Sequence, residues 1–507
     1  MNSQGFPATQ RPELACTTQY LAWYARHTPD AIAITEAGVE VTYAALAADL
    51  VRYVRALQSL PIERGMLVGV EAGVRYLHLQ LLLACDIIGA ATVSLLPPDL
   101  GDGHPMARDC DWLLAAAAPP PDHRHKTRRL STDWLAEVAA RAVAPVDLAI
   151  LDRAIPGDQI VRLLRTSGTT GDPKWMTLSH ARLQAIIANH AASSLRGLPS
   201  RPRFLCQHHV TWRAAHSHIQ ECLQHGGTVL FVSGEDVVAL IGAGKADCVI
   251  FALGEIQQMI HRAGPDRPGH KLHVGVIGAA VGPLLRHQIR HRMNAQLVVN
   301  YSTNETGRIA CVDDEGVGTL YPGVDVRIVD QTGRALPYGE IGLIHARTET
   351  MVEGYYQDPA LTAAKFVDGW FLTGDLGCMP APDRLVVVGR ADDVLNVGSI
   401  KLAPAPLEEQ LRTIDGVTEA ALVSVEDPDG VDMLLVAIEA ENGVPPPDLV
   451  TRISPILLPC YPLFKVLVLP RMPRTETGKV KRGDIRQDFL LATGQRPPSR
   501  AQGSPGR

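Results

Sequence analysis

The sequence lacks the cysteine patterns that mark disulfide scaffolds and zinc fingers. Its nine cysteines are odd in number and no two of them form a C-x-x-C pair, so neither a disulfide framework nor a cysteine zinc site is expected. Positive charge is not in excess either, because 48 Lys and Arg against 54 Asp and Glu give a formal net charge of −6. Nucleic acid and anionic lipid are therefore not expected as partners.

A targeting signal and a membrane-spanning run are also missing. The N-terminus is polar and shows no basic segment followed by an apolar one, which a secretory signal would need. The most apolar stretch, 77–96, is interrupted by His78 and Asp86, so it is typical of a buried helix followed by a strand. We expect no transmembrane segment and a cytoplasmic protein.

What the chain does have is apolar material in alternating strand and helix lengths. The 507 residues are 46% hydrophobic, enough for two or three packed domains. Segments 67–71, 78–88 and 90–96 read as strand, helix and strand, which predicts a parallel sheet covered by helices. Further strands are expected at 160–164, 228–232, 274–277 and 296–299.

The pattern changes after Arg390. A charged stretch rich in glycine and proline leads to an amphipathic helix near 407–414 and to alternating strands near 418–425 and 433–439. The fold class that follows is α/β, with several α/β subdomains in a large N-terminal domain and a small α+β C-terminal domain. The expected bounds are 1–390 for the N-terminal domain, 391–492 for the C-terminal domain and 493–507 for a disordered tail.

One motif, T-S-G-T-T-G-D-P-K at 166–174, suits a polyphosphate. Glycines let backbone N–H groups converge on an anion, hydroxyls add donors, and a lysine supplies a mobile cation. The spacing of a Walker A loop is missing, and alone the motif also fits a hydroxyl-rich surface turn. The candidate phosphate-binding residues are Thr166, Ser167, Gly168, Thr169, Thr170, Gly171 and Lys174.

This segment resembles the phosphate loop of the adenylate-forming superfamily, which comprises acyl-CoA synthetases, luciferases and the adenylation domains of peptide synthetases. Four further motifs follow in the family's order, and five ordered motifs identify the chain as a member. They are N-Y-S-T-N-E at 300–305, G-W-F-L-T-G-D at 369–375, G-R-A-D-D at 389–393 and P-R-T-E-T-G-K at 473–479.

The resemblance implies activation of a carboxylate. A carboxylate is a poor acyl donor, because its charge repels nucleophiles and oxide is a poor leaving group. Joining it to AMP gives a mixed anhydride, from which a thiol then takes the acyl group. The implied small molecules are a carboxylic acid, its acyl-adenylate and CoA or a phosphopantetheine arm, with Mg²⁺ where ATP is used.

The same resemblance assigns roles to single residues. Glu305 would bind Mg²⁺ through a hard oxygen, with Asn304 beside it on the nucleotide side. Asp375 would accept hydrogen bonds from the ribose hydroxyls, which Arg390 would also reach. Lys479 would lie between the carboxylate and the α-phosphate and offset charge in the transition state.

Two further segments match the family's movable and adenine-binding parts. Asp392 corresponds to the hinge about which the small C-terminal domain rotates between the two half-reactions, which makes that domain mobile. Gly278, Ala279 and Ala280 resemble the family's adenine loop of small residues. The alternative for that loop is a simple turn from strand to helix.

The segment 204–213 aligns with the family's acid pocket, where acyl-activating members often show a histidine. No aspartate is present to pair with an ammonium group, so an amino acid substrate is disfavoured. If 212–223 is helical, His216 and His218 point to different faces, so a zinc site is not expected. The candidate pocket residues are His208, His209 and Trp212, with His209 also a candidate catalytic group.

The chain departs from the family where the phosphates would bind. Trp175 stands where a glycine is usual after the lysine, and Ser302 and Asn304 replace a glycine and a threonine. A glycine there permits positive φ and close approach to an anion. An indole that points inward would fill the space of the β- and γ-phosphates, whereas one that points outward would leave ATP binding intact. Asp375 and Arg390 are unchanged.

This asymmetry predicts an acyl-CoA synthetase relative that retains thioester formation from an acyl-adenylate and has weakened adenylation. A separate adenylating enzyme would then supply the adenylate of a bulky acid, as the resemblance to diterpenoid-acid CoA ligases of actinomycete antibiotic pathways suggests. One alternative is a complete ATP-dependent ligase that delivers to CoA or a carrier protein. Another is a pseudoenzyme that only binds an acyl-adenylate.

Overall fold

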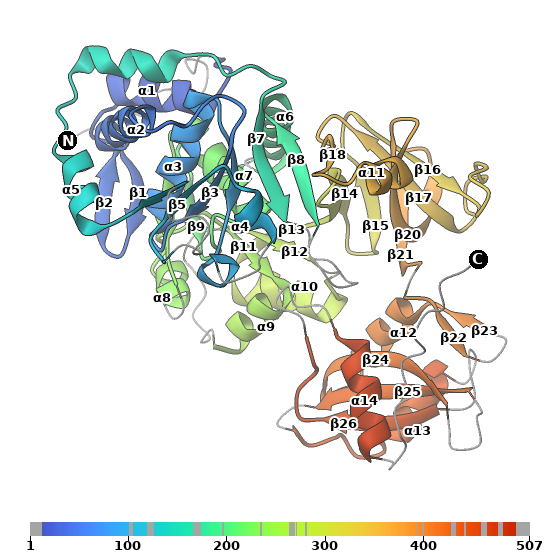
Figure 1. The fold of residues 1–507 in the computed structure, drawn as a ribbon. Helices are drawn as coiled ribbons and strands as arrows, with labels where there is room; N and C mark the ends of the chain where they lie inside the picture. The colour runs from blue at the N-terminus through green and yellow to red at the C-terminus, as the bar shows by residue number, and fades with distance from the viewer. Residues whose placement is uncertain are drawn as a thin grey trace.

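The computed structural model has a large N-terminal domain and a small C-terminal domain, as the sequence predicts (Figure 1). Elements from blue to light orange form the first, and deeper orange to red elements form most of the second. The described residues are 13–100, 105–118, 126–165, 174–194, 197–233, 236–262, 269, 271–278, 281–391, 393–397, 400–426, 432–440, 443–457, 464–474 and 480–492.

The larger sheet of the N-terminal domain has fourteen strands. Its strands from β1 through β10, β9, β11 and β12 to β13 are parallel, and those from β13 onward are antiparallel. In spatial order they are β16 (Val324–Val329), β17 (Gly342–Thr348), β20 (Trp370–Ala381) with β19 (Phe366–Val367) beside it, β21 (Arg384–Arg390), β15 (Val317–Leu320), β14 (Gly307–Val312), β13 (Ala295–Thr303), β12 (Leu272–Ile277), β11 (Cys248–Ala252), β9 (Arg203–Cys206), β10 (Thr228–Phe231), β1 (Ile32–Glu36) and β2 (Val39–Thr42).

A second sheet of seven strands contains the predicted strand-helix-strand unit. β3 pairs with β4 in parallel, and α3 (Arg75–Ile88) connects them, so that prediction is confirmed. The leucines of α3 are buried on all sides of the helix. For this reason the segment has a continuous apolar sequence. In order the strands are β18 (Gly354–Tyr355), β8 (Trp175–Ser179), β7 (Ile160–Arg165), β4 (Ala91–Ser94), β3 (Leu67–Glu71), β5 (Trp112–Ala115) and β6 (Thr127–Arg129).

Two helices connect the sheets through polar contacts in the interior. Asp86 of α3 accepts two hydrogen bonds from the guanidinium of Arg162 on β7, at 2.5 and 2.9 Å. His216 of α7 (Arg213–Gln224) bonds the same guanidinium, and α7 packs on β9 and β10 of the larger sheet. Arg162 and Asp86 are both buried, so this ion pair holds the strand that leads into the phosphate motif.

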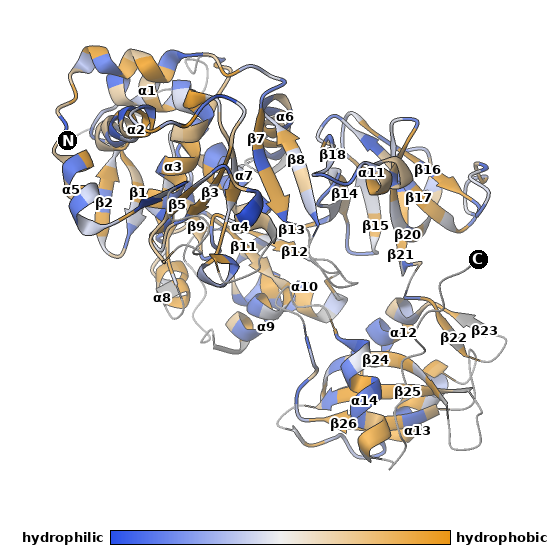
Figure 2. Cartoon of the chain, viewed as in Figure 1, coloured by the Kyte–Doolittle hydropathy of each residue, from blue (hydrophilic) through white to orange (hydrophobic). Residues whose placement is uncertain are grey.

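The other helices of the N-terminal domain cover the two sheets (Figure 1). Figure 2 shows orange apolar residues concentrated on the strands and blue polar residues on outward faces. No helix within the described ranges is both long enough and apolar enough to span a bilayer. These helices are α1 (Thr17–His27), α2 (Tyr43–Gln58), α4 (Pro105–Asp109), α5 (Thr132–Ala139), α6 (His180–Ser194), α8 (Asp236–Gly242), α9 (Leu253–Arg262), α10 (Pro283–Arg292) and α11 (Pro359–Lys365).

The C-terminal domain has a three-stranded sheet with apolar clusters on both faces. The predicted helix near 407–414 is α12 (Pro404–Leu411), which starts earlier because proline is favoured in the first helical turn. The predicted boundary at 390/391 follows the end of β21, and the predicted tail lies outside the described residues. The remaining elements are β22 (Leu395–Val397), β23 (Ile400–Leu402), β24 (Val417–Glu426), β25 (Asp432–Ala440), α13 (Leu449–Leu457), β26 (Phe464–Leu469) and α14 (Arg482–Ala492).

Sequence-predicted strands at 160–164, 228–232, 274–277 and 296–299 are present as β7, β10, β12 and β13. The strands predicted near 418–425 and 433–439 are β24 and β25. β13 is longer than expected and runs to Thr303. It therefore carries most of the second motif out of the parallel part of the sheet and into the antiparallel part.

Candidate active site

The phosphate motif joins β7 to β8. β7 ends at Arg165 and β8 begins at Trp175, and these two residues pair across the antiparallel strands. Residues 166–173 lie outside the described residues. Of the predicted motif the structure therefore places Lys174, together with the unusual residue that follows it.

Lys174 lies on the same side of β8 as Glu305. Its Nζ atom is 6.0 Å from the centroid of the Tyr355 ring, and the Tyr355 hydroxyl donates a hydrogen bond to Glu305 Oε1 over 2.9 Å. Burial raises the pKa of Tyr355, and the Glu305 carboxylate raises it further, so the phenol remains a donor. The first and second motifs, distant in the sequence, thus meet at Tyr355.

Trp175 takes the outward orientation. Its half-buried indole packs with Tyr356 against an apolar cluster that includes Leu95, Met106 and Leu163. Its backbone is extended in β8, and its carbonyl accepts a hydrogen bond from the Tyr356 N–H over 2.7 Å. Because successive residues of a strand point to opposite faces, the indole lies across β8 from Lys174. Of the two orientations that the sequence left open, the structure has this one.

A buried arginine lies under the second motif. Arg213, at the start of α7, donates hydrogen bonds to the backbone carbonyls of Asn304 and Thr303. Burial lowers the pKa of Arg213 to about 10, and the nearby Glu305 carboxylate opposes that effect. The guanidinium stays charged at neutral pH and fixes the backbone from which Glu305 projects.

Asp375 and Arg390 meet as register partners on β20 and β21. Arg390 Nη1 is 3.1 Å from Asp375 Oδ1, and the Tyr301 hydroxyl donates to Asp375 Oδ2 over 2.5 Å. Burial and the Asp375 charge both raise the pKa of Tyr301. Tyr301 was not among the predicted site residues, although it belongs to the N-Y-S-T-N-E motif, and that membership was the signal that could have found it.

Gly278 closes β12 with a φ of +90°, a conformation that favours glycine. This observation fits a tight turn at the predicted adenine loop, and its other members, Ala279 and Ala280, lie outside the described residues. The predicted hinge Asp392 and the predicted catalytic Lys479 also lie outside them.

The predicted pocket histidines face different neighbours. His208 Nε2 is 2.9 Å from Glu255 Oε2, and the His208 ring stacks on Trp212 with centroids 4.5 Å apart. His209 meets His78 edge to face at 5.1 Å, and burial lowers its pKa. His208 and Trp212 are therefore brought together, whereas His209 turns toward α3.

The prediction that His216 and His218 point to different faces of one helix is confirmed. His216 contacts Arg162 and Gln220, whereas the His218 ring faces Arg308 on β14, with His218 Nε2 3.0 Å from Arg308 Nη2. The two imidazoles therefore do not share a ligand position.

A cavity lies next to the second motif. Its apolar wall comes from strands β11, β12 and β13, and it reaches the segment 300–304. The lining includes neither of the predicted pocket histidines nor Trp212. Sequence reasoning did not single out His190 and Arg308, because they come from separate elements with no motif spacing. The polar side chains on the cavity wall include His190, Arg213, Ser217, His218 and Arg308.

Comparison with known proteins identifies the family and the fold. The family model described as AMP-binding enzyme matches residues 21–356, well over half of the chain. The chain belongs to the AMP-binding enzyme family. Over 494 residues it is 26% identical to a feruloyl-CoA synthase from Amycolatopsis sp, with 92% of this chain and 97% of that protein covered.

Two solved structures have the same fold as this family member. O-succinylbenzoate coenzyme A synthetase from Bacillus subtilis, in complex with AMP, is 21% identical with a TM-score of 0.77 and covers 92% of this chain and 98% of that one. ATP-bound MatB from Rhodopseudomonas palustris is 20% identical with a TM-score of 0.77 and covers 93% and 99%. The α/β fold with a large N-terminal and a smaller C-terminal domain is thereby confirmed.

Proposed function

We propose that this AMP-binding family member is an acid-thiol ligase that converts an acyl-adenylate and CoA to an acyl-CoA thioester. The observation that carries the proposal is the assembled network of Tyr301, Asp375 and Arg390, which suits the ribose of an adenylate. The similarity to feruloyl-CoA synthase along nearly the whole chain supports CoA as the acceptor.

The proposed reaction is a single acyl transfer. The thiol sulfur of CoA attacks the carbonyl carbon of the mixed anhydride, and a carbon–sulfur bond forms. The bond from that carbon to the phosphate oxygen breaks, AMP leaves with the electron pair, and the thiol proton passes to solvent. Lys479 keeps the proposed role of offsetting charge between the carboxylate and the α-phosphate when the adenylate forms. Asp392 is the proposed hinge that opens the thiol's path between the predicted domains 1–390 and 391–492.

We further propose that ATP-dependent adenylation is impaired through restricted freedom of the loop exit. The indole does not fill the phosphate space in this proposal, because it packs on the face of β8 opposite Lys174. The exit of the phosphate loop is held by an apolar anchor, the Trp175 indole, and by the backbone hydrogen bond from Tyr356. A loop that must wrap a triphosphate needs freedom at that point, and Ser302 and Asn304 change the second motif beside it. A separate adenylating enzyme would then deliver the adenylate of a bulky acid, such as a diterpenoid acid of antibiotic biosynthesis, in the cytoplasm.

A complete ATP-dependent ligase is the second candidate, and the outward indole favours it, since the side chain packs on the face of β8 opposite Lys174. Thr166, Ser167, Gly168, Thr169, Thr170, Gly171 and Lys174 would then bind the phosphates. Glu305 offers the hard carboxylate oxygens that Mg²⁺ prefers, so it fits the ion if ATP is used.

The test supplies synthetic acyl-adenylates to the purified protein with either CoA or a phosphopantetheinylated carrier protein. We expect acyl-CoA and AMP in equal amounts. Transfer to the carrier alone would replace CoA as the acceptor. Tight adenylate binding without thioester formation to either acceptor would overturn the proposal in favour of a pseudoenzyme.

A further inference from the structure

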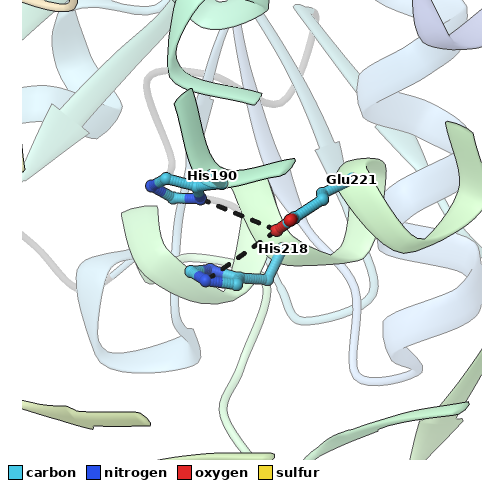
Figure 3. A group of neighbouring side chains, drawn as sticks. All are labelled: His190, His218 and Glu221. Carbon is cyan, nitrogen blue, oxygen red and sulfur yellow. Dashed lines mark ion pairs between the residues drawn. The ribbon is translucent and has the colours of Figure 1, made fainter. Parts of the chain in front are cut away.

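A polar cluster lies on the helical wall of the cavity beside the second motif (Figure 3). His190 comes from α6, whereas His218 and Glu221 stand about one turn apart on α7. A nitrogen of each imidazole is 3.9 Å from Glu221 Oε2, and the two rings are tilted by 34° with centroids 4.3 Å apart. His190 and His218 line the cavity, and Glu221 is 1% exposed.

The three side chains have the spacing of a metal site, because their ligand atoms lie within 4.8 Å of one another. Arg308 argues against a metal ion. His218 Nδ1 lies 2.7 Å from the Ala214 carbonyl oxygen and must donate to it, so Nε2 carries the lone pair, which accepts from Arg308. A metal ion would have to displace the guanidinium and then face its charge.

The charges of the cluster follow from its burial. Burial lowers the pKa of His218 to about 3 and raises that of Glu221 to about 8. At neutral pH the imidazole is therefore uncharged and the carboxyl is mostly protonated. Burial also lowers the pKa of Arg308, but a guanidinium starts so high that it keeps its charge. The wall thus presents the guanidiniums of Arg308 and Arg213 among neutral groups. Arg213 already donates to the backbone carbonyls of Thr303 and Asn304.

We propose that Arg308, oriented by His218, binds a hydrogen-bond-accepting oxygen on the body of the acid, separate from the carboxylate that is activated. The inference rests on the proposed function, because that function makes this cavity the acid pocket. Arg308 pairs with Ser302 across β13 and β14, so its side chain enters the cavity next to the second motif. A guanidinium only donates hydrogen bonds, which sets the polarity of the group that it binds.

The apolar wall of the cavity indicates what the rest of the bound acid must be. Val249, Val274, Val276 and Val298 line it, and Gly275 adds bare backbone. An apolar wall facing the Arg308 guanidinium selects a hydrophobic acid with one additional oxygen, as a hydroxyl, a carbonyl or a second carboxylate. All three provide the same acceptor oxygen.

The test uses binding alone, so that it does not depend on turnover. The probes are the unreactive sulfamoyl-adenosine analogues of cinnamic acid and of its 3-hydroxy, 4-hydroxy and 4-carboxy derivatives, with affinities measured by titration calorimetry. We expect at least one oxygenated analogue to bind the wild-type protein about 10- to 100-fold more tightly than the cinnamoyl analogue, the range of hydrogen bonds to a charged group. The hydroxyl and carboxyl arms tell which oxygen is preferred.

Two variants test whether the preference for oxygenated analogues depends on Arg308 and His218. Arg308→Met should abolish it while leaving the affinity for the cinnamoyl analogue within about twofold, and His218→Phe, which keeps a flat ring, should reduce it. The second variant keeps the test decisive if Arg308→Met does not fold. Arg327→Met is the matched control, because Arg327 stacks on Trp370 at β16, outside the cavity lining, and it should leave the preference intact.

No preference in the wild-type protein, an intact preference in Arg308→Met or in His218→Phe, or no binding of any analogue would overturn the inference. So would stoichiometric metal in the purified protein that is lost in His218→Phe. A clear preference in binding without thioester formation from the matching adenylates would refute the proposed function and leave this inference standing.

Discussion

The ribose side and the phosphate side of the candidate active site are built differently. The ribose side consists of Tyr301, Asp375 and Arg390, all on regular strands of one sheet and joined by hydrogen bonds. The phosphate side depends on the start of β8, where the side chains of Lys174 and Trp175 lie on opposite faces of the strand. Strand register fixes the positions of Tyr301, Asp375 and Arg390, whereas Lys174 precedes β8 and is fixed by register only through its neighbour Trp175. This difference is why we assign the adenylate to the first side and the impairment to the second.

The largest expected effect concerns the support beneath the phosphate side. Asp86→Ala would leave the Arg162 guanidinium buried without its carboxylate, and breaking such a pair costs about 3–5 kcal/mol. We expect the free energy of unfolding, measured with denaturant, to fall by that amount. Asp152→Ala is the control, because Asp152 pairs with Arg26 at the surface, where an ion pair contributes about 1 kcal/mol or less. Equal losses in the two variants would show that the interior pair is not a support.

The next largest effect concerns adenylate binding at the proposed ribose side. Asp375→Ala removes the acceptor of both Tyr301 and Arg390, and we expect it to weaken binding of an acyl-adenylate by about 1.5–3 kcal/mol, the usual contribution of a charge-assisted hydrogen bond. Calorimetry with an unreactive adenylate measures this loss. Asp325→Ala, which breaks an exposed pair with Arg347, should bind as the wild type does. Unchanged affinity in Asp375→Ala would place the ribose elsewhere.

The smallest expected effect concerns ATP–pyrophosphate exchange at the proposed phosphate side. Trp175→Gly removes the apolar anchor and returns freedom to the loop exit, so we expect weak ATP–pyrophosphate exchange to appear at a cost of about 1–2 kcal/mol in stability, since the indole is half-buried. Thioester formation from a preformed adenylate should hardly change. Trp175→Phe keeps an apolar anchor and is the control. Exchange of equal size in both variants would contradict the role of the indole.

The sequence predicted the fold well where burial dominates. The apolar run in α3 and the strands on either side were found because a helix or a parallel strand buried on all sides is apolar throughout. The motif residues Asp375 and Arg390 were singled out through the ordered resemblance, and the structure pairs them across β20 and β21. Their partner Tyr301 was passed over although it belongs to the second motif, because the motif does not show which of its members contacts Asp375.

The orientation of Trp175 could have been inferred only by recognising that it begins a strand. Alternation along β8 then sends the indole and Lys174 to opposite faces. His190 and Arg308 had no such signal, because a cavity wall assembled from α6, α7 and β14 depends on tertiary packing alone. The ring of the predicted His209 contacts His78 of α3 and does not line this cavity, and its role stays a prediction.

The most direct test compares the two half-reactions in one preparation of the wild-type protein. ATP–pyrophosphate exchange is measured with a panel of bulky and aromatic acids, and acyl-CoA formation is measured from the corresponding synthetic adenylates. We predict thioester formation from at least one adenylate and little or no exchange with the same acid. Exchange as fast as thioester formation would contradict this prediction and establish a complete ATP-dependent ligase.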